Sequence, residues 1–266
     1  MTEYLKPTCD RKTKFWKNQK NTYGLLPGLE GSCPGATTAP GGCWHIKPGR
    51  KLPECYVAHT MSAYKGVRNV LEHNTRLLKA ASFDEKVRLL NDEFARFRKA
   101  EMRRTEAKLV YRIHWSGDIF DMDYANALAK AIQDNPDIEF WNYTRSLFAV
   151  PVLCNIENLR LYISLDPVNI QQGTMTYVEH KTTKNHLQVC YMSDIDDFED
   201  HMQRAHNILT EENRLRESMG YKPKSGDLPR KLTPCPVDTG KLKLEMGCAV
   251  CKRCVKTLPD PVFFKT

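Results

Sequence analysis

Apolar residues recur every three or four positions in the first half of the chain, the spacing that places side chains on one face of a helix. One such face is formed by Met61, Tyr64, Val67 and Leu71. A second helix is predicted to begin at Ser82, because Glu85 follows three residues later and completes a capping box. Its apolar positions are Val87, Leu90, Phe94 and Phe97.

From about residue 108 the pattern alternates between short strands and helices. Four β-rich runs are predicted to be strands: KLVYRIHWSGD at 108–118, IEFWNYTRS at 138–146, LRLYISLDP at 159–167 and HLQVCYMS at 186–193. Between the first two runs, Ala125, Leu128 and Ile132 give a helix one apolar face. A long helix with Phe198, Met202, Ala205 and Leu209 follows Asp194 and Asp196, whose carboxylates suit a helix N-terminus.

Strands separated by helical crossovers indicate an α/β fold with parallel pairing, either an open doubly wound sheet or a complete or partial β/α barrel. We divide the chain into a basic N-terminal segment with a Gly/Pro-rich cysteine loop (1–58), an α/β barrel body (59–221) and a C-terminal cysteine segment (222–266). We expect the three parts to form one compact unit.

Polar residues gather where three successive strands are predicted to end, the edge that carries active sites in parallel α/β folds. The catalytic candidates among them are His114, Asp118, Thr144 and Asp166. Ser116, Asn142, Arg145 and Ser164 accompany them. The structural alternatives are helix capping or a turn for the aspartates, and a hydrogen-bonded core position for His114.

The chain has ten cysteines, and a cytosolic chain of 266 residues needs no disulfide bonds for stability. The cysteines therefore favour ligation of a metal or a cluster. Near the C-terminus, Cys248, Cys251 and Cys254 are separated by two residues each, and Cys235 precedes them. This run is predicted to ligate a [4Fe-4S] cluster. A structural zinc site with four thiolates is the alternative, and the four need not all bind the same centre.

A second group, Cys33, Cys43 and Cys55, lies in a Gly/Pro-rich segment that is predicted to be a ligand-holding loop. Three cysteine ligands leave one iron of a cluster open to a cofactor or substrate, so this group is a candidate cofactor-binding site. Because the gaps between the three are wide, two alternatives stay open: purely structural thiols, or ligands of the C-terminal cluster.

The net charge of +8 is concentrated at the two ends, since residues 1–22 carry +4, residues 222–266 carry +6 and the remainder carries −2. Basic ends suit a nucleic acid, with Phe15 and Trp16 able to stack on bases; a solvated surface is the alternative. The lysines concerned are Lys12, Lys14, Lys17, Lys222, Lys224 and Lys231. No stretch has the length and apolarity of a membrane span or signal peptide, so we expect a cytoplasmic protein without a membrane partner.

The segments SCPGAT, Cys55 with Tyr56, RIHWSGDIF, FWNYTRS, LYISLDP and the closing CP…C..C..C together resemble the phage-encoded, cysteine-rich proteins of the gene product 88 family. The likeness spans about residues 24–255. It implies a TIM-barrel-like fold, an iron–sulfur cluster, a relation to radical-SAM proteins and a location in an infected bacterium. The chain has no CxxxCxxC, the usual radical-SAM motif, so use of S-adenosylmethionine stays open.

Two functions follow from these features. The first is redox or radical chemistry on a nucleotide, nucleic acid or protein target, carried out by a [4Fe-4S] protein. The alternative is a non-enzymatic iron–sulfur protein that binds nucleic acid or a host regulator and uses its cluster for structure or redox sensing.

Overall fold

The computed structural model describes residues 3–8, 19–103, 109–192 and 198–224, together with the backbone of two short strands at 233–234 and 262–264. The strands of this part form one parallel sheet in the order β1-β2-β3-β4-β6-β5. They are β1 (Val110–Arg112), β2 (Glu139–Thr144), β3 (Leu159–Leu165), β4 (Leu187–Met192), β5 (Thr233–Pro234) and β6 (Val262–Phe264). The predicted α/β fold with parallel pairing is confirmed.

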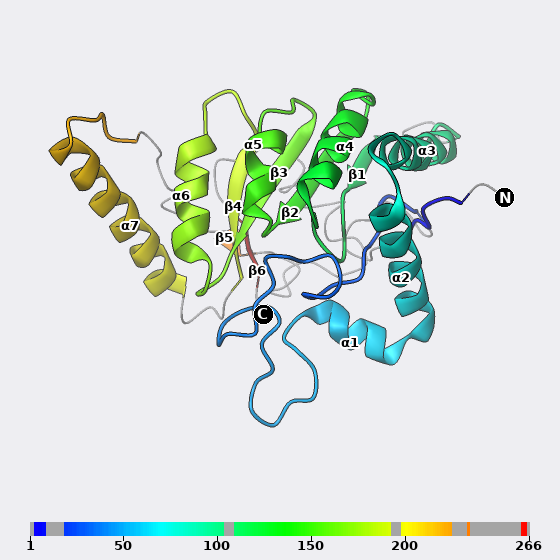
Figure 1. Cartoon of the computed structure of the whole chain (residues 1–266), viewed down its shortest axis with the longest axis horizontal. Helices are drawn as coiled ribbons and strands as arrows, with labels where there is room; N and C mark the ends of the chain where they lie inside the picture. Colours follow the sequence, from blue (N-terminus) through cyan, green and yellow to red (C-terminus); the bar gives the residue numbers. More distant parts are fainter. Residues whose placement is uncertain are drawn as a thin grey trace.

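Helices alternate with the strands of the sheet and precede it. They are α1 (Tyr56–Ala63), α2 (Lys65–Ala80), α3 (Phe83–Glu101), α4 (Met122–Gln133), the 3₁₀ helix η1 (Leu147–Ala149), α5 (Val150–Leu153), α6 (Ile170–His180) and α7 (Phe198–Ser218). The first four strands follow one another in chain order, and right-handed crossovers between such strands place their helices on one face. Figure 1 shows α4, α5 and α6 together in front of the sheet.

A closed barrel is not formed by the part of the chain described above. Its sheet is open, with β1 at one end of the strand order and β5 at the other. The expected complete barrel is therefore corrected to an open parallel sheet, and the doubly wound alternative is not seen either, because the connecting helices share one face.

Residues 21–25 extend the sheet beyond β1. The Arg112 N–H donates to the Asn21 carbonyl at 2.9 Å, the Trp115 N–H to Tyr23 at 3.1 Å, and the Leu25 N–H to Ser116 at 2.8 Å. Thr22 also forms a parallel bridge to Arg112. The segment therefore runs parallel to the end of β1, and it delivers the residues after it to the carboxyl edge of the sheet.

Aromatic rings fill the space between α3 and the first two strands. Phe94 lies 5.2 Å from Tyr111 and 4.7 Å from Phe140, and Phe97 lies 5.0 Å from Tyr111, between ring centroids. The predicted capping box is confirmed in part, since the Ser82 side chain accepts from the Glu85 N–H. Burial of the Leu90, Phe94 and Phe97 face explains why this helix forms.

The predicted helix through Met61, Tyr64, Val67 and Leu71 is wrong at its centre. Tyr64 is extended, with φ −132° and ψ 97°, and separates α1 from α2. Its side chain is exposed, whereas Leu71 is buried. The three- to four-residue spacing of apolar side chains therefore runs across the break between α1 and α2. It does so because the pattern counts Tyr64 as an apolar residue although its side chain is exposed. The long helix predicted after Asp194 and Asp196 is present as α7, and those two aspartates lie outside the described residues.

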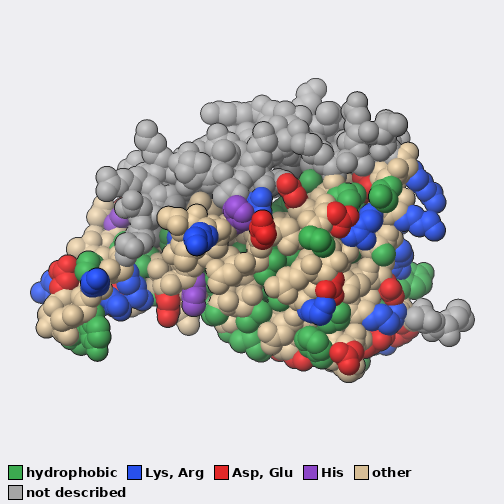
Figure 2. All heavy atoms as spheres, turned by 90° about the horizontal axis from the view of Figure 1, so that it is seen from above, with side chains coloured by type: hydrophobic (Ala, Val, Ile, Leu, Met, Phe, Trp, Pro, Cys, Tyr) green, Lys and Arg blue, Asp and Glu red, His purple; other side chains and the backbone are tan. Residues whose placement is uncertain are grey.

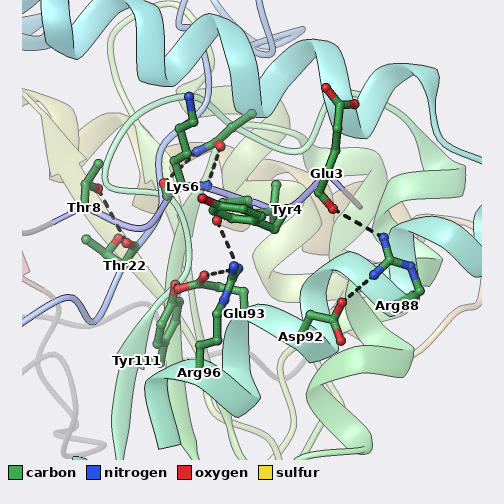
Figure 3. A network of polar contacts seen from close by, with 12 residues as sticks. Glu3, Tyr4, Lys6, Thr8, Thr22, Arg88, Asp92, Glu93, Arg96 and Tyr111 are labelled. Atoms are coloured by element: carbon green, nitrogen blue, oxygen red, sulfur yellow. Dashed lines mark hydrogen bonds and ion pairs between the residues drawn. The ribbon is translucent and has the colours of Figure 1, made fainter. Parts of the chain in front are cut away.

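A buried carboxyl, Glu93, ties α3 to β1 and to the N-terminal residues (Figure 3). Glu93 accepts from the Tyr111 hydroxyl at 2.9 Å and from the Arg96 guanidinium at 2.8 Å. Arg96 also donates to the Leu5 carbonyl at 3.0 Å and lies 4.8 Å from the Tyr4 ring centroid. Burial raises the pKa of Glu93 from 4.5 to about 7, although Arg96 and Tyr111 oppose that rise.

This raised pKa predicts that stability falls with rising pH. A carboxyl with a higher pKa in the folded chain contributes stability below its unfolded pKa of 4.5 and loses it as the pH passes about 7. The loss attributable to Glu93 is about 2 kcal/mol between about pH 5 and about pH 8. Urea denaturation at several pH values should show that Glu93→Gln removes this part of the decline. Equal pH dependence in both proteins would contradict the assignment.

Candidate functional site

The cysteine loop lies against the carboxyl ends of β1, β2 and β3. Close backbone approaches at glycines show the contact: a methyl group on Gly35 would lie 2.6 Å from the Arg145 carbonyl oxygen, just after β2. One on Gly41 would lie 3.1 Å from Pro167, after β3. The loop is therefore packed onto the edge where the sequence predicts polar site residues.

The end of β1 meets the same loop through Gly117. This glycine has φ +79°, a conformation that L side chains rarely adopt, and a methyl group there would lie 2.4 Å from the Ser32 hydroxyl oxygen. The turn allows Ser32 to accept from the Asp118 N–H at 3.2 Å while it donates to the Leu26 carbonyl at 2.8 Å. Ser32, next to Cys33 in the chain, thus anchors the first cysteine to β1.

Cys33, Cys43 and Cys55 lie near this edge, close enough for their charges to act on one another, and each residue is partly exposed. Burial raises the pKa of all three thiols. Cys43 and Cys55 raise the pKa of Cys33 further, and Cys43 does the same for Cys55, because neighbouring negative charges oppose ionisation. In protein without bound metal, the three cysteines of the loop are therefore neutral thiols.

Cys55 lies at the start of α1, where backbone N–H groups have no partner within the helix. Burial raises its pKa, and the N–H groups of Val57 and Ala58 oppose that rise. The next residue, Tyr56, donates its hydroxyl to the Trp115 carbonyl beyond β1. Tyr56 therefore ties Cys55 to the end of β1, the same strand end to which Ser32 ties Cys33.

Asp118 and Thr144, two of the predicted catalytic residues, are bonded to each other. The buried Asp118 carboxylate accepts from the Thr144 hydroxyl at 2.7 Å and from the Arg145 N–H at 2.7 Å. Burial raises the pKa of Asp118, against these hydrogen bonds, which lower it. The carboxylate joins the ends of β1 and β2, so it positions the edge that carries the loop.

Asp166, the second predicted carboxylate, forms an ion pair with Arg145 in which both side chains are buried. Its other oxygen accepts from the Val168 and Asn169 N–H groups at 2.9 Å each. Asp166 therefore stabilises a turn, as its structural alternative predicts. It also holds the Arg145 side chain near the cysteine loop.

His114 belongs to a different cluster. Its Nε2 lies 2.6 Å from the Tyr124 hydroxyl, which in turn lies 2.6 Å from the Tyr23 hydroxyl. Burial lowers the pKa of His114 to about 3, so its imidazole is neutral. The backbone of His114 has φ +48°, which is unusual for a residue other than glycine. These contacts agree with the structural alternative given for His114, a hydrogen-bonded position in the core.

A model of the family described as "Gene product 88" matches residues 4–257 of this chain. The chain belongs to the gene product 88 family. It is similar to the Gene 88 proteins of Mycobacterium phages L5 and D29, at 40% and 37% identity over 152 residues. These matches cover 56% of this chain and 59% and 58% of the relatives, so the chain spans about three-fifths of their length. No solved structure matches the chain.

Membership of the gene product 88 family confirms the resemblance seen in the sequence and supports a bacteriophage origin. None of the described helices is long and apolar enough to cross a membrane. In the part of the chain described here, no group of three or more Cys, His, Asp or Glu side chains is arranged to hold a metal ion.

Several predicted residues of this gene product 88 protein lie outside the described part. These are the metal candidates Cys235, Cys248, Cys251 and Cys254, and the basic-end residues Lys12, Lys14, Phe15, Trp16, Lys17 and Lys231. Lys222 is exposed and Lys224 half-buried after α7. Figure 2 shows Lys and Arg side chains interspersed with Asp and Glu on the described surface that it displays.

A fourth cysteine near this edge, Cys190, was not predicted from the sequence. Cys190 of β4 lies opposite Ser164 of β3 in the sheet register, and its charge acts on Arg145. Alternation along β4 could have placed Cys190 on the face that also carries Ser164, but no sequence pattern connects it to Arg145, which follows β2.

The bonds of Asp118 predict a test by substitution. Asp118→Ala leaves the buried Thr144 hydroxyl and Arg145 N–H without their acceptor, at about 1–3 kcal/mol for each donor. Asp118→Asn keeps one acceptor oxygen, so it should lower the free energy of unfolding less than alanine does. Denaturant titration measures both losses; an alanine variant as stable as the parent protein would exclude the positioning role.

Proposed function

We propose that this chain is an iron–sulfur protein in which Cys33, Cys43 and Cys55 bind one cluster at the carboxyl edge of the sheet. The observation that carries the proposal is the convergence of these three thiols, from gaps of nine and eleven residues, on one edge of a parallel sheet. Such edges hold the active sites of parallel α/β enzymes.

The donor chemistry fits a cluster. Thiolates are the ligands of iron–sulfur clusters, and a cubane takes one thiolate at each of several iron corners. Its ligands are therefore spread further apart than the ligands of a single ion. Partial exposure of the three cysteines leaves a route for iron and sulfide, and Arg145 supplies a positive charge beside them.

A cluster bound by three cysteines supplies one-electron chemistry and an iron position open to a further ligand. The residues of this chain would hold and orient it: Ser32 and Tyr56 fix the loop to β1, and the Asp118–Thr144 bond fixes β1 to β2. An open position next to the strand ends favours redox or radical chemistry over a purely structural cluster. S-adenosylmethionine is not part of the proposal, because the chain lacks CxxxCxxC.

The fold and setting of the proposal follow the same observations. Strands β1 to β4 succeed one another in chain order with their helices on one face, the arrangement found in a β/α barrel, which supports a partial barrel. The phage origin of the relatives supports action inside an infected bacterium. The C-terminal cysteines would ligate a second centre or share the first.

The test is iron binding by single-cysteine variants. Protein purified without oxygen should be brown and carry about four iron and four sulfide for each cubane that it binds. Cys33→Ser, Cys43→Ser and Cys55→Ser should each lower iron content and the visible absorption. Cys154→Ser is the matched control, because Cys154 is buried at the end of α5.

Two results would overturn the proposal. The first is a wild-type protein that holds stoichiometric zinc and no sulfide. The second is full iron and sulfide content in all three serine variants, which would move the cluster to other residues. Circular dichroism of each variant shows whether a loss of iron reflects a lost ligand or a lost fold.

A further inference from the structure

The chain between Cys43 and Cys55 includes a short loop, residues 45–54, which we call the basic loop. Figure 1 shows it in light blue beside α1, extending away from the strands of the sheet. All residues from 46 to 51, which include its tip, are exposed. The basic loop therefore presents its side chains to solvent next to the cysteine site.

A hydrogen-bonded turn fixes the tip of the basic loop. The Arg50 N–H donates to the Lys47 carbonyl at 2.9 Å. Pro48 and Gly49 occupy the two central positions, and Gly49 has φ +79°, as a type II β-turn requires. Proline and glycine are the residues that this turn favours at those positions, so the local sequence itself specifies the shape of the tip.

The two ends of the basic loop are tied together at its base. The Glu54 N–H donates to the His45 carbonyl at 2.9 Å, and the Lys47 ammonium pairs with the Glu54 carboxylate at 2.5 Å. The Nδ1 atom of His45 also lies 3.0 Å from the Thr38 carbonyl oxygen. These contacts hold the turn in place relative to the rest of the cysteine loop.

Positive charge is concentrated on the basic loop and on the two helices that follow it. Residues 45–71 contain five Lys or Arg and one Glu, whereas the chain between its two basic ends carries a net charge of −2. All five cations are exposed. Glu54 offsets Lys47, but Arg50 and Lys51 have no ion pair within the described part of the chain. These two cations are therefore available to an anion from outside the chain.

The surroundings of these cations favour a nucleic acid over an acidic protein. The centre of a protein interface is poor in lysine, whereas Lys and Arg side chains are the usual partners of backbone phosphates. Just after the basic loop, the Tyr56 side chain is 53% exposed, and its hydroxyl donates to the Trp115 carbonyl. Because that bond holds the ring in place, the ring offers a stacking surface to a base of a single strand.

We propose that the basic loop binds a single-stranded nucleic acid, with Arg50 and Lys51 on its phosphates and Tyr56 against a base. The inference goes beyond the proposed function and requires no cluster. Because the basic loop lies in the chain between Cys43 and Cys55, the bound strand would lie beside the cysteine site.

The test is a salt titration of the full chain with a fluorescently labelled single-stranded DNA or RNA, followed by anisotropy. The logarithm of the binding constant should fall linearly with the logarithm of salt concentration. Arg50→Gln combined with Lys51→Gln should weaken binding several-fold and make the slope shallower by about 1.4, at about 0.7 for each phosphate contact of a single strand. A duplex of the same length should bind less tightly, because its bases are not free to stack on Tyr56.

The matched control is Lys99→Gln combined with Lys184→Gln, which changes the net charge equally. Both lysines are exposed and lie toward the amino edge of the sheet. Lys99 follows Arg98, which pairs with Asp137 just before β2, and Lys184 precedes β4. This control pair should leave the affinity and the salt slope near those of the wild type.

A third variant tests the turn without altering charge. Gly49→Val places a β-branched side chain at φ +79°, where such residues are strained, so it should disrupt the turn and weaken binding several-fold. Gly49 has no neighbour within 4 Å that the new side chain would meet. The circular dichroism of this variant should therefore equal that of the wild type.

Several results would overturn the inference. One is no binding of single-stranded DNA or RNA at about 50 mM salt. Another is equal binding in the Arg50 and Lys51 double variant and in the control pair, which would assign the affinity to other cations of the chain. Competition by polyglutamate as effective as that by an unlabelled oligonucleotide would indicate an acidic protein, and tighter binding of the duplex would exclude the single strand. None of these results changes the iron and sulfide content, which tests the proposed function separately.

Discussion

The parallel pairing of residues 21–25 with the end of β1 is the interaction on which the rest of the site depends. Three backbone hydrogen bonds fix this pairing, from Arg112 to Asn21, from Trp115 to Tyr23 and from Leu25 to Ser116. Because the pairing is parallel, the chain leaves it at the carboxyl edge of the sheet. The loop with its three cysteines can then cover the ends of β1, β2 and β3.

Burial gives the edge its chemical character. Asp118 and the Arg145–Asp166 pair are withdrawn from water, and each finds fixed partners across strand ends instead of solvent. Buried charges are tolerated only when they are paired or hydrogen-bonded. The polar residues therefore hold the strand ends together, and Arg145, Asp166 and Asp118 also shift the pKa of Cys43.

Most helices and strands of this chain were predictable from the sequence. The packing of the cysteine loop on the carboxyl edge of the sheet was not. Strands β2, β3 and β4 and helix α4 follow from local composition: the strands are short β-rich runs that are mostly buried, and α4 buries the apolar face that its helical spacing predicts. The pairing of residues 21–25 has no local signal, since it depends on a strand about ninety residues away. The placement of Cys33 near Cys55 at the sheet edge depends in turn on that pairing. His114 shows the converse, because a polar residue at a strand end lies in an aromatic core.

The fold brings Cys33, Cys43 and Cys55 to one edge of the sheet, and cross-linking in metal-free protein measures their proximity directly. A short bifunctional thiol reagent, with mass spectrometry of the peptides, should join these three cysteines to one another in the folded chain. The same links should be lost in denaturant, and Cys154 should stay unlinked to them in the folded protein. Equal yields of these links in folded and denatured chains would contradict the account.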